Sequence, residues 1–529
     1  MELFLRFIQF MVKIFYFVIH ALLKLALPRK KEQTIPPIRN KLLTLSLVEL
    51  VQRMRLHQLK SKELVQAYID RIREVNPHIN AIIEERFEEA LKDAERADDM
   101  LNKCPLDQTQ SLFTRYPILG IPFTVKESCG LKGMAHVVGS LERVGQKAQY
   151  DCVPVENFRS AGGIPLLVSA TPEYCFSIET NSFTNDRCLN PYDFRRTCGG
   201  SSGGEGALHG SGASIFGIGS DIAGSIRIPC LFNGVFGHKP TGGLISNLGH
   251  FPNSDDPKCL EYLQMGPITR FGRDLGMLLQ VMIGRKADKL ELLTPVDTKE
   301  IKVFYSFGFD GLNGLLHQPV DFDIQLSIMK AVKYFEKKGC SNERARIKHF
   351  RNSTEMGLTG IARLSNFPYL MRADNKPPQV KENIKELIKG TFGYSKYTKE
   401  ALIFELMRST NVFMPRDNME KYEAEVKLLK QEIIDLLGWH GVLFFPTFHI
   451  PAIHHNSSVF PLWGIDYCLI FNILGLPCTH IPMGLDSNGL PIGFQVVAAP
   501  MRDKLCLQVA GELEQGFGGW VPPTKHDFK

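Results

Sequence analysis

Hydrophobic residues in the body of the chain follow two alternating patterns. A first run places apolar residues at helical spacing, at Leu64, Tyr68, Ile72 and Val75. Asn76-Pro77 is expected to end that helix, and a second helical run extends from Phe87 to about Asn102. Short β-rich stretches separate the helices, at 121–125, 164–168, 442–446 and 493–497. This alternation predicts an α/β fold around a mostly buried sheet.

Two later segments, 324–337 and 421–437, have the periodicity of long amphipathic helices. Residues 345–420 carry no motif, and we interpret them as helices that cover a functional site formed elsewhere in the chain. No internal repeat is found.

The first 27 residues are strongly apolar, and the run stops abruptly at Pro28-Arg29-Lys30-Lys31. Four basic residues interrupt it, at Arg6, Lys13, His20 and Lys24. At about 100° per residue, all four fall within an arc of about 40° on a helix. Residues 1–27 are therefore predicted to form an apolar helix with one basic stripe. A linker over 28–44, broken by Pro36-Pro37, and one large domain over 45–529 follow.

This N-terminal pattern favours a membrane anchor. The segment is near the ~20 residues that a bilayer requires, but Lys13 would then lie mid-membrane, where a charge costs roughly 2.5–3.5 kcal/mol. A helix lying in the interface, with its stripe facing anionic head groups, avoids that cost. A cleaved signal peptide fits less well, because the basic residues interrupt its apolar core and no small-residue cleavage site follows. A buried core helix is the remaining alternative.

Composition excludes some classes of protein. The 62 basic and 56 acidic residues give a net charge of only +6, without a long basic run in the body or a zinc-finger or RNA-recognition pattern, so a nucleic-acid partner is not expected. The 12 cysteines form no CxxC pair, which argues against a metal or redox site. Dispersed thiols in a long chain fit a reducing, intracellular compartment better than a disulfide framework.

The candidate chemistry lies in two glycine- and serine-rich blocks. They are Gly199-Gly200-Ser201-Ser202-Gly203-Gly204-Glu205-Gly206 and Gly217-Ile218-Gly219-Ser220-Asp221-Ile222-Ala223-Gly224-Ser225-Ile226-Arg227-Ile228-Pro229. Glycine lets the backbone approach a substrate closely, because only glycine enters φ > 0 freely. Turn N–H groups beside a serine also suit an oxyanion hole. A tight structural loop explains the same residues equally well.

Two familiar motifs are absent from these blocks. GxxxxGK[ST] does not occur, which excludes a phosphate-binding P-loop. The Gly-x-Ser-x-Gly nucleophile elbow is missing around both Ser201 and Ser225.

Blocks spread over residues 43–521 resemble the amidase signature family. Besides the serine blocks they are Leu119–Glu127, Asn190–Asp193, Gly237–Thr241, Gly266–Arg270, Gly475–Pro477 and Gly489–Gln495. The resemblance implies a large mixed β-sheet flanked by helices. Within the family the chain is most similar to the membrane-bound fatty-acid amide hydrolases, in particular the second animal type. Gly203–Gly206, Phe236–Pro240 and the hydrophobic N-terminus carry that similarity.

The resemblance also implies the roles of individual residues. Ser225 is expected to be the nucleophile that forms an acyl-enzyme, and Ser201, in a cis peptide after Gly200, to bridge it to Lys126. The backbone N–H groups expected to bind the oxyanion are those of Ile222, Ala223, Gly224 and Ser225. Ser202 is expected to hydrogen-bond near Lys126. No metal and no organic cofactor is implied.

This relay is chemically coherent. Lys126 acts as a base only when its amine is neutral, which burial away from carboxylates favours. Glu127 is adjacent, but neighbours on a strand point to opposite faces, so it is not expected to pair with Lys126. Ser201 would pass a proton from Ser225 to Lys126, and the reverse transfer would protonate the leaving amine.

Two other polar residues in these blocks are expected to be structural. Arg227 is assigned to a salt bridge and His238 to a turn, with no role in catalysis. Three residues depart from the family pattern. Ala223 replaces the first of two glycines before the nucleophile, and a positive φ there would cost roughly 1–2 kcal/mol. Asp186 and Cys188 stand where glycine and serine or threonine are expected.

The resulting hypothesis is hydrolysis of fatty-acid amides, either primary amides or N-acylethanolamines, to a free fatty acid and an amine. The alternatives are an amidase of the same family for short-chain or aryl amides and a weakly active lipid-binding scaffold. An amidotransferase subunit is disfavoured because an anchor would obstruct its assembly. The expected partners are a small lipid amide and an intracellular membrane, such as the endoplasmic reticulum or a lipid droplet surface. A homodimer is left open.

Overall fold

The computed structural model describes residues 34–284, 287, 290–309, 317–372, 378–409, 418–457 and 464–528. The predicted anchor, 1–27, lies outside these residues. Among the residues that are described, no helix combines the length and the apolar character needed to cross a bilayer. The end of the linker, 34–40, has no regular structure, yet Ile35 and Ile38 are buried in the core of the domain.

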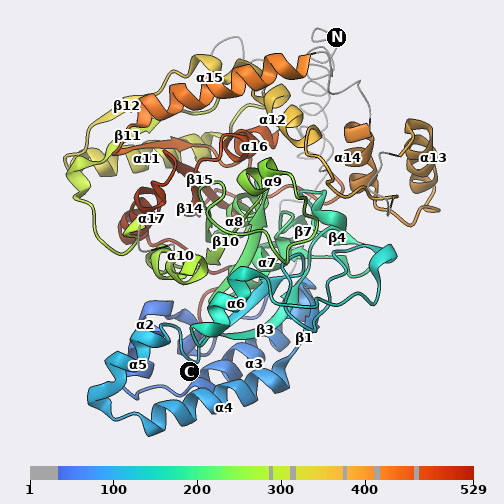
Figure 1. Cartoon of the computed structure of the whole chain (residues 1–529). Helices are drawn as coiled ribbons and strands as arrows, with labels where there is room; N and C mark the ends of the chain where they lie inside the picture. The colour runs from blue at the N-terminus through green and yellow to red at the C-terminus, as the bar shows by residue number, and fades with distance from the viewer. Residues whose placement is uncertain are drawn as a thin grey trace.

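An 11-stranded mixed sheet runs through the centre of the molecule (Figure 1). β2 pairs in parallel with β3 and β8, and β11 pairs in parallel with β12 and β13, while the other neighbours are antiparallel. In spatial order the strands are β1 (Ile82–Glu85), β3 (Ile164–Ser169), β2 (Pro122–Lys126), β8 (Phe216–Asp221), β10 (Gln264–Thr269), β9 (Phe236–Lys239), β14 (Cys478–Leu485), β15 (Pro491–Ala498), β13 (Gly441–Phe445), β11 (Lys302–Tyr305) and β12 (Asn342–Arg344). Two small hairpins, β4–β5 (Asn181–Ser182, Asp186–Arg187) and β6–β7 (Leu189–Asn190, Asp193–Thr197), lie outside it.

The four predicted strands correspond to β2, β3, β13 and β15, and the α/β class is confirmed. Every residue of these four strands is buried. A strand covered on both faces reads as a continuous apolar run, which is the pattern that identified them.

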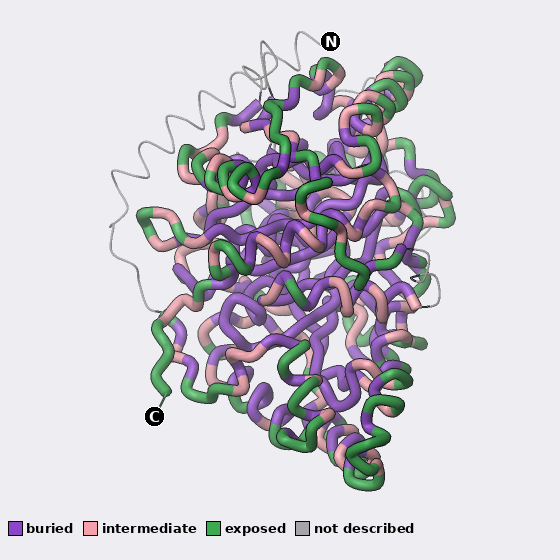
Figure 2. The backbone as a smooth tube through the Cα atoms, turned by 90° about the vertical axis from the view of Figure 1, so that its left-hand side faces the viewer, coloured by how far each residue is buried: buried purple, intermediate pink, exposed green. Residues whose placement is uncertain are grey.

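Helices cover both faces of the sheet, and the buried backbone forms a continuous interior between exposed peripheral helices (Figures 1 and 2). They are α2 (Leu47–Arg55), α3 (Ser61–Ile79), α4 (Phe87–Lys103), α5 (Thr109–Arg115), α6 (Val153–Ser160), α7 (Gly203–Gly210), α8 (Arg227–Asn233), α9 (Pro257–Tyr262), α10 (Leu275–Ile283), α11 (Phe322–Lys337), α12 (Ser353–Ala362), α13 (Val380–Thr391), α14 (Lys399–Ser409), α15 (Met419–Leu437), α16 (Asp466–Ile473) and α17 (Asp503–Phe517). The predicted helices at 87–102, 324–337 and 421–437 match α4, α11 and α15.

One predicted helix end is wrong. α3 continues through Pro77 to Ile79 instead of stopping at Asn76-Pro77. Proline removes its own N–H from the helical ladder and crowds the carbonyl four residues earlier, but Ile79 is fully buried, which favours the extra turn. The helix ends instead at Asn80, which adopts the left-handed conformation with φ 48°.

The segment without a motif, 345–420, contains α12, α13 and α14. α13 and α14 lie side by side at the edge of the molecule (Figure 1). α12 packs against α15 and α16, close to the loop that follows β8.

Candidate active site

Lys126 is the last residue of β2 and is fully buried. Its Nζ lies 2.6 Å from Ser201 Oγ and 3.0 Å from Ser220 Oγ. The Glu127 carboxylate instead accepts a hydrogen bond of 3.0 Å from the Val137 N–H. Lys126 makes no ion pair with any carboxylate in the described part of the chain, as the alternation of side chains along a strand predicts.

Ser201 lies in a tight turn before α7. The peptide bond between Gly200 and Ser201 is cis, as the family resemblance implied. A side chain at Gly200 is excluded, because its Cβ would lie 2.5 Å from the Ser177 carbonyl oxygen. The Ser201 carbonyl accepts a 2.9 Å hydrogen bond from Thr171 Oγ1, which holds the turn against the loop after β3.

Ser225 lies in the loop between β8 and α8. Gly224 has φ +110°, a conformation that favours glycine, and a Cβ there would lie 2.8 Å from Cys468 Cβ. Ala223 is not among the residues with positive φ. Ala223 therefore does not carry the free-energy cost of a positive φ. Of the two positions before Ser225, only 224 requires glycine.

The backbone N–H groups of this loop do not all point at a substrate. The Gly224 N–H donates to Asp221 Oδ1 at 2.7 Å, so it is not free to bind an oxyanion. Within the described residues, no hydrogen bond takes up the N–H groups of Ile222, Ala223 or Ser225. Three of the four predicted donors remain available.

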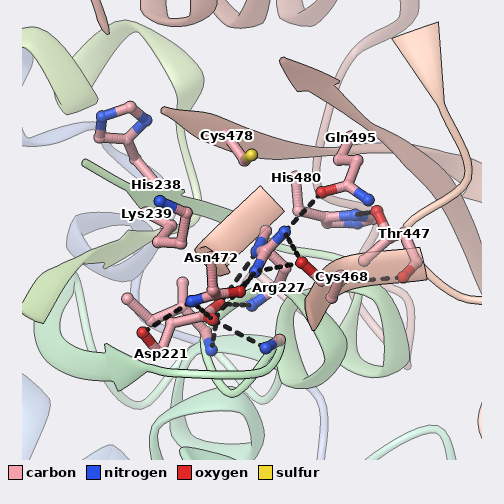
Figure 3. A network of polar contacts seen from close by, with 12 residues as sticks. Asp221, Arg227, His238, Lys239, Thr447, Cys468, Asn472, Cys478, His480 and Gln495 are labelled. Atoms are coloured by element: carbon pink, nitrogen blue, oxygen red, sulfur yellow. Dashed lines mark hydrogen bonds and ion pairs between the residues drawn. The ribbon is translucent and has the colours of Figure 1, made fainter. Parts of the chain in front are cut away.

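A buried ion pair supports the same loop. Arg227 Nε lies 2.9 Å from Asp221 Oδ2, and both side chains are fully buried. Asn472 Nδ2 donates to Asp221 Oδ1 at 2.9 Å, and Gln495 Oε1 accepts from Arg227 Nη1 at 2.7 Å (Figure 3). Burial alone would raise the pKa of Asp221, but the Arg227 charge and these hydrogen bonds hold it below its usual value. Arg227 is structural, as predicted.

Sequence reasoning missed two residues beside Lys126. Ser220 is the penultimate residue of β8, before Asp221, and its Oγ contacts both Lys126 Nζ and, at 2.8 Å, His250 Nε2. Ser202 bonds to the Ser220 backbone at 3.3 Å, so it acts near Lys126 without touching it. Ser220 lies in the second glycine- and serine-rich block, where Asp221 and Ser225 are the more conspicuous residues. His250 lies in a loop without a motif and had no sequence signal.

Another buried carboxyl group lies close enough to Lys126 to interact with it electrostatically. Glu205 of α7 accepts hydrogen bonds from Ser169 Oγ at 2.7 Å and Thr124 Oγ1 at 2.6 Å. Burial raises its pKa to about 7, against the opposing effects of these hydrogen bonds and of Lys126. The residue appears in the serine block, but nothing in the sequence indicated that it would be fully buried.

The serines open into one cavity of about 1450 Å³, a volume that includes its mouth. At its polar end lie Ser201, Ser220, Ser225 and His250. The rest is mainly apolar, and we call the following residues the apolar wall: Leu358 and Ile361 of α12, Ile403, Phe404 and Met407 of α14, and Ile465 and Leu469 at α16. Helices from 345–420 thus form much of the wall, as predicted.

The other conspicuous residues lie outside this cavity. His238 bonds to Asp503 Oδ1 at 3.1 Å and Thr479 Oγ1 at 2.8 Å, and it is buried as a structural residue. Asp186 is exposed in a β-hairpin with φ 55°, where glycine would also fit. Cys188 is buried, and all 12 cysteines are free thiols. Among the described residues, no group of histidine, cysteine or carboxylate side chains could hold a metal ion.

Comparisons with known proteins identify the family of the chain. A family model described as Amidase matches residues 63–507. Fatty-acid amide hydrolase 2-B of Danio rerio is 41% identical over 515 residues, which cover 95% of each chain. Fatty-acid amide hydrolase 2 of Homo sapiens is 37% identical over 522 residues, covering 96% of this chain and 95% of the human one.

Solved structures share the fold at lower identity. 6-aminohexanoate cyclic dimer hydrolase superposes with a TM-score of 0.72 at 23% identity, covering 92% of this chain and 99% of the other. A structure described as fatty acid amide hydrolase has a TM-score of 0.70 at 19% identity, covering 91% of this chain and 86% of the other.

Proposed function

Because this chain belongs to the amidase family and is a serine amidase, we propose that it hydrolyses fatty-acid amides, either primary amides or N-acylethanolamines. One observation carries the proposal. Ser201, whose Oγ lies 2.6 Å from Lys126 Nζ, and Ser225 both line a cavity whose remaining wall is mainly aliphatic and aromatic. Two relatives that align over nearly the whole chain are named fatty-acid amide hydrolases.

The chemistry starts with proton transfer. Neutral Lys126 takes the proton of Ser201, 2.6 Å away, while Ser201 takes the proton of Ser225. Ser225 Oγ then attacks the amide carbonyl carbon and forms a tetrahedral intermediate. The proton returns through Ser201 to the leaving nitrogen as the C–N bond breaks. Water hydrolyses the resulting acyl-enzyme by the same relay. In the structure no hydrogen bond joins Ser201 to Ser225, so this step requires the hydroxyl groups to turn toward each other when substrate binds.

The oxyanion is bound by backbone N–H groups. With the Gly224 N–H committed to Asp221, the donors are those of Ile222, Ala223 and Ser225. Loss of one such donor typically costs about 2.7–4 kcal/mol of transition-state stabilisation. The Asp221–Arg227 pair keeps the loop in shape without contacting substrate.

The apolar wall selects the acyl group. Phe404 packs against Phe176 with tilted rings whose centroids lie 4.4 Å apart, and Ile361, Phe367 and Leu469 belong to the same hydrophobic cluster. Burying a methylene of the substrate contributes ≈ 0.8 kcal/mol, so each added carbon of a long chain strengthens binding. A short amide leaves most of this wall in contact with water.

Membrane association is proposed on two grounds. The first is the apolar N-terminal segment, 1–27. The second is an exposed apolar row on α13 and its C-terminal cap, which we call the α13 stripe: Val380 (39% exposed), Ile384 (45%), Ile388 (56%) and Phe392 (72%). Lys381, Lys385 and Lys389 flank it, which suits an anionic lipid surface. α13 packs on α14, a helix of the apolar wall, so a bound membrane would lie beside the cavity.

A panel of amides of graded acyl length tests the function, run with the wild-type chain and Ser225→Ala. We expect kcat/KM to rise with chain length and turnover to vanish in the variant. A fluorophosphonate probe should label wild type and not Ser225→Ala. Equal activity on short or aryl amides would favour the short-chain alternative, and a wild-type chain that neither turns over nor labels would favour a scaffold.

A further inference from the structure

His250 ends a chain of hydrogen bonds that starts at the relay. Its Nδ1 lies 2.8 Å from the Pro252 carbonyl oxygen, and its Nε2 lies 2.8 Å from Ser220 Oγ. A carbonyl only accepts, so Nδ1 carries the hydrogen. In a neutral imidazole the other nitrogen is then an acceptor, and the Ser220 hydroxyl must donate to it.

The neutral form is favoured by the surroundings of His250. The ring is buried, and this burial is the main cause that lowers the pKa of His250 to about 3. The carbonyl contact to Pro252 opposes this only partly. The contact of Nδ1 with the Pro252 carbonyl and that of Nε2 with Ser220 therefore fix the neutral tautomer that carries its hydrogen on Nδ1.

The orientation of His250 decides what Ser220 can do. A hydroxyl has one hydrogen, and Ser220 donates it to Nε2 of His250. Toward Lys126 Nζ, 3.0 Å away, Ser220 Oγ can then only accept a hydrogen bond. If Ser220 donated instead, its hydrogen would occupy the lone pair with which neutral Lys126 takes the proton of Ser201.

We propose that His250 is a positioning residue of the relay: through Ser220 it directs an N–H of Lys126 away from Ser201 and keeps the lysine lone pair on Ser201. This rests on the proposed function only in taking Lys126 as the base. His250 touches neither Lys126 nor Ser201 through a hydrogen bond, so it acts through the hydroxyl of Ser220.

A structural role is the competing explanation, because His250 and Ser220 both line the cavity. A wall residue would change substrate affinity, whereas an orienting residue changes the chemical step. The test therefore uses His250→Leu, His250→Gln, Ser220→Ala and the double variant Ser220→Ala/His250→Leu in the full chain. Glutamine keeps an acceptor oxygen for Ser220, and leucine does not. His136→Leu is the matched control, because His136 contacts Phe251 beside His250 but makes no hydrogen bond to Ser220.

Two readouts are measured, steady-state turnover of a long-chain amide and the rate of fluorophosphonate labelling. We expect His250→Leu and Ser220→Ala each to lower kcat and the labelling rate by about 10–100-fold, with KM within about twofold. His250→Gln should stay within about threefold of wild type. In the Ser220→Ala background, His250→Leu should add less than about twofold.

Four results would overturn the proposal: equal loss in His250→Gln and His250→Leu, a change confined to KM, full multiplication of the two losses in the double variant, or unchanged rates in Ser220→Ala. The Ser220→Ala and His250→Gln variants keep the test decisive if His250→Leu does not fold, since unchanged rates in Ser220→Ala alone refute it. If wild type labels rapidly at Ser225 but does not hydrolyse long-chain amides, the proposed substrate fails while the labelling series still tests His250.

Discussion

The two ends of the cavity are built in different ways. At the polar end, side chains at the ends of the adjacent strands β2 and β8 are fully or almost fully buried. They form hydrogen bonds with residues that are distant in the sequence, as Lys126 does with Ser201 and Ser220. The apolar wall consists of helix side chains from α12, α14 and α16 that touch one another only by packing. Hydrogen bonds fix direction, whereas packing of apolar side chains tolerates substitution of similar volume. We therefore propose that residues held by the sheet carry out the reaction and that the helices of the apolar wall select the substrate.

The largest expected effect comes from removing Lys126, the proposed base, at the polar end of the cavity. Lys126→Met should lower kcat by about 10²–10⁴-fold, because no other described group can take the proton of Ser201. Combining it with Ser201→Ala should cost little more than either change alone, since residues of one relay act as a unit. Lys132→Met, at an exposed lysine, is the control. Steady-state kinetics compare these four variants with wild type, and additive losses would contradict a shared relay.

Next in size is a loss of stability beneath the nucleophile loop. Asp221→Asn leaves the Arg227 charge buried without its partner and should lower the free energy of unfolding by about 3–5 kcal/mol. Urea unfolding measures it, with Asp107→Asn at an exposed position as the control. The pKa of Asp221 is depressed in the folded state, so its contribution is present above the usual value of 3.8 and is lost as pH falls below it. If Asp221→Asn is as stable as wild type at pH 7, the Asp221–Arg227 pair does not stabilise the loop as we infer.

A smaller effect is expected at the apolar wall. Ile403→Trp fills part of the cavity and should lower kcat/KM for a long-chain amide by about 10–100-fold while a short-chain amide reacts nearly as before. Leu428→Trp, at an exposed position of α15, controls for the added bulk. Equal loss for long and short amides would mean that the wall also shapes the polar end, which would break the division between the two ends.

The smallest effect is expected at the α13 stripe. Ile384→Glu with Ile388→Glu should lower kcat/KM about fivefold for a long-chain amide presented in anionic vesicles, and leave hydrolysis of a soluble short-chain amide unchanged. Leu428→Glu is the control for charge on an exposed helix. If the soluble substrate slows equally, the stripe supports the wall and does not contact lipid.

The sequence was informative where short motifs or long periodic runs carry the structure. Four strands, three helices, the buried lysine and the serine blocks were predicted within a few residues. The end of α3 was not, because burial of Ile79 overrides the local effect of Pro77. His250 could not be predicted, because its role depends on a contact with a strand end 30 residues earlier in the chain. The commitment of the Gly224 N–H to Asp221 also depends on loop geometry that spacing does not reveal.

The Asp221–Arg227 pair also has a bearing on biosynthesis. Two of its hydrogen-bond partners, Asn472 and Gln495, lie 251 and 268 residues beyond the groups that they hold. A ribosome finishes the nucleophile long before it makes the strand and helix that brace it, so a nascent or truncated chain carries Ser225 on an unsupported loop. We therefore expect hydrolytic activity to arise only once β15 has joined the sheet, and chains truncated before Gln495 to be inactive.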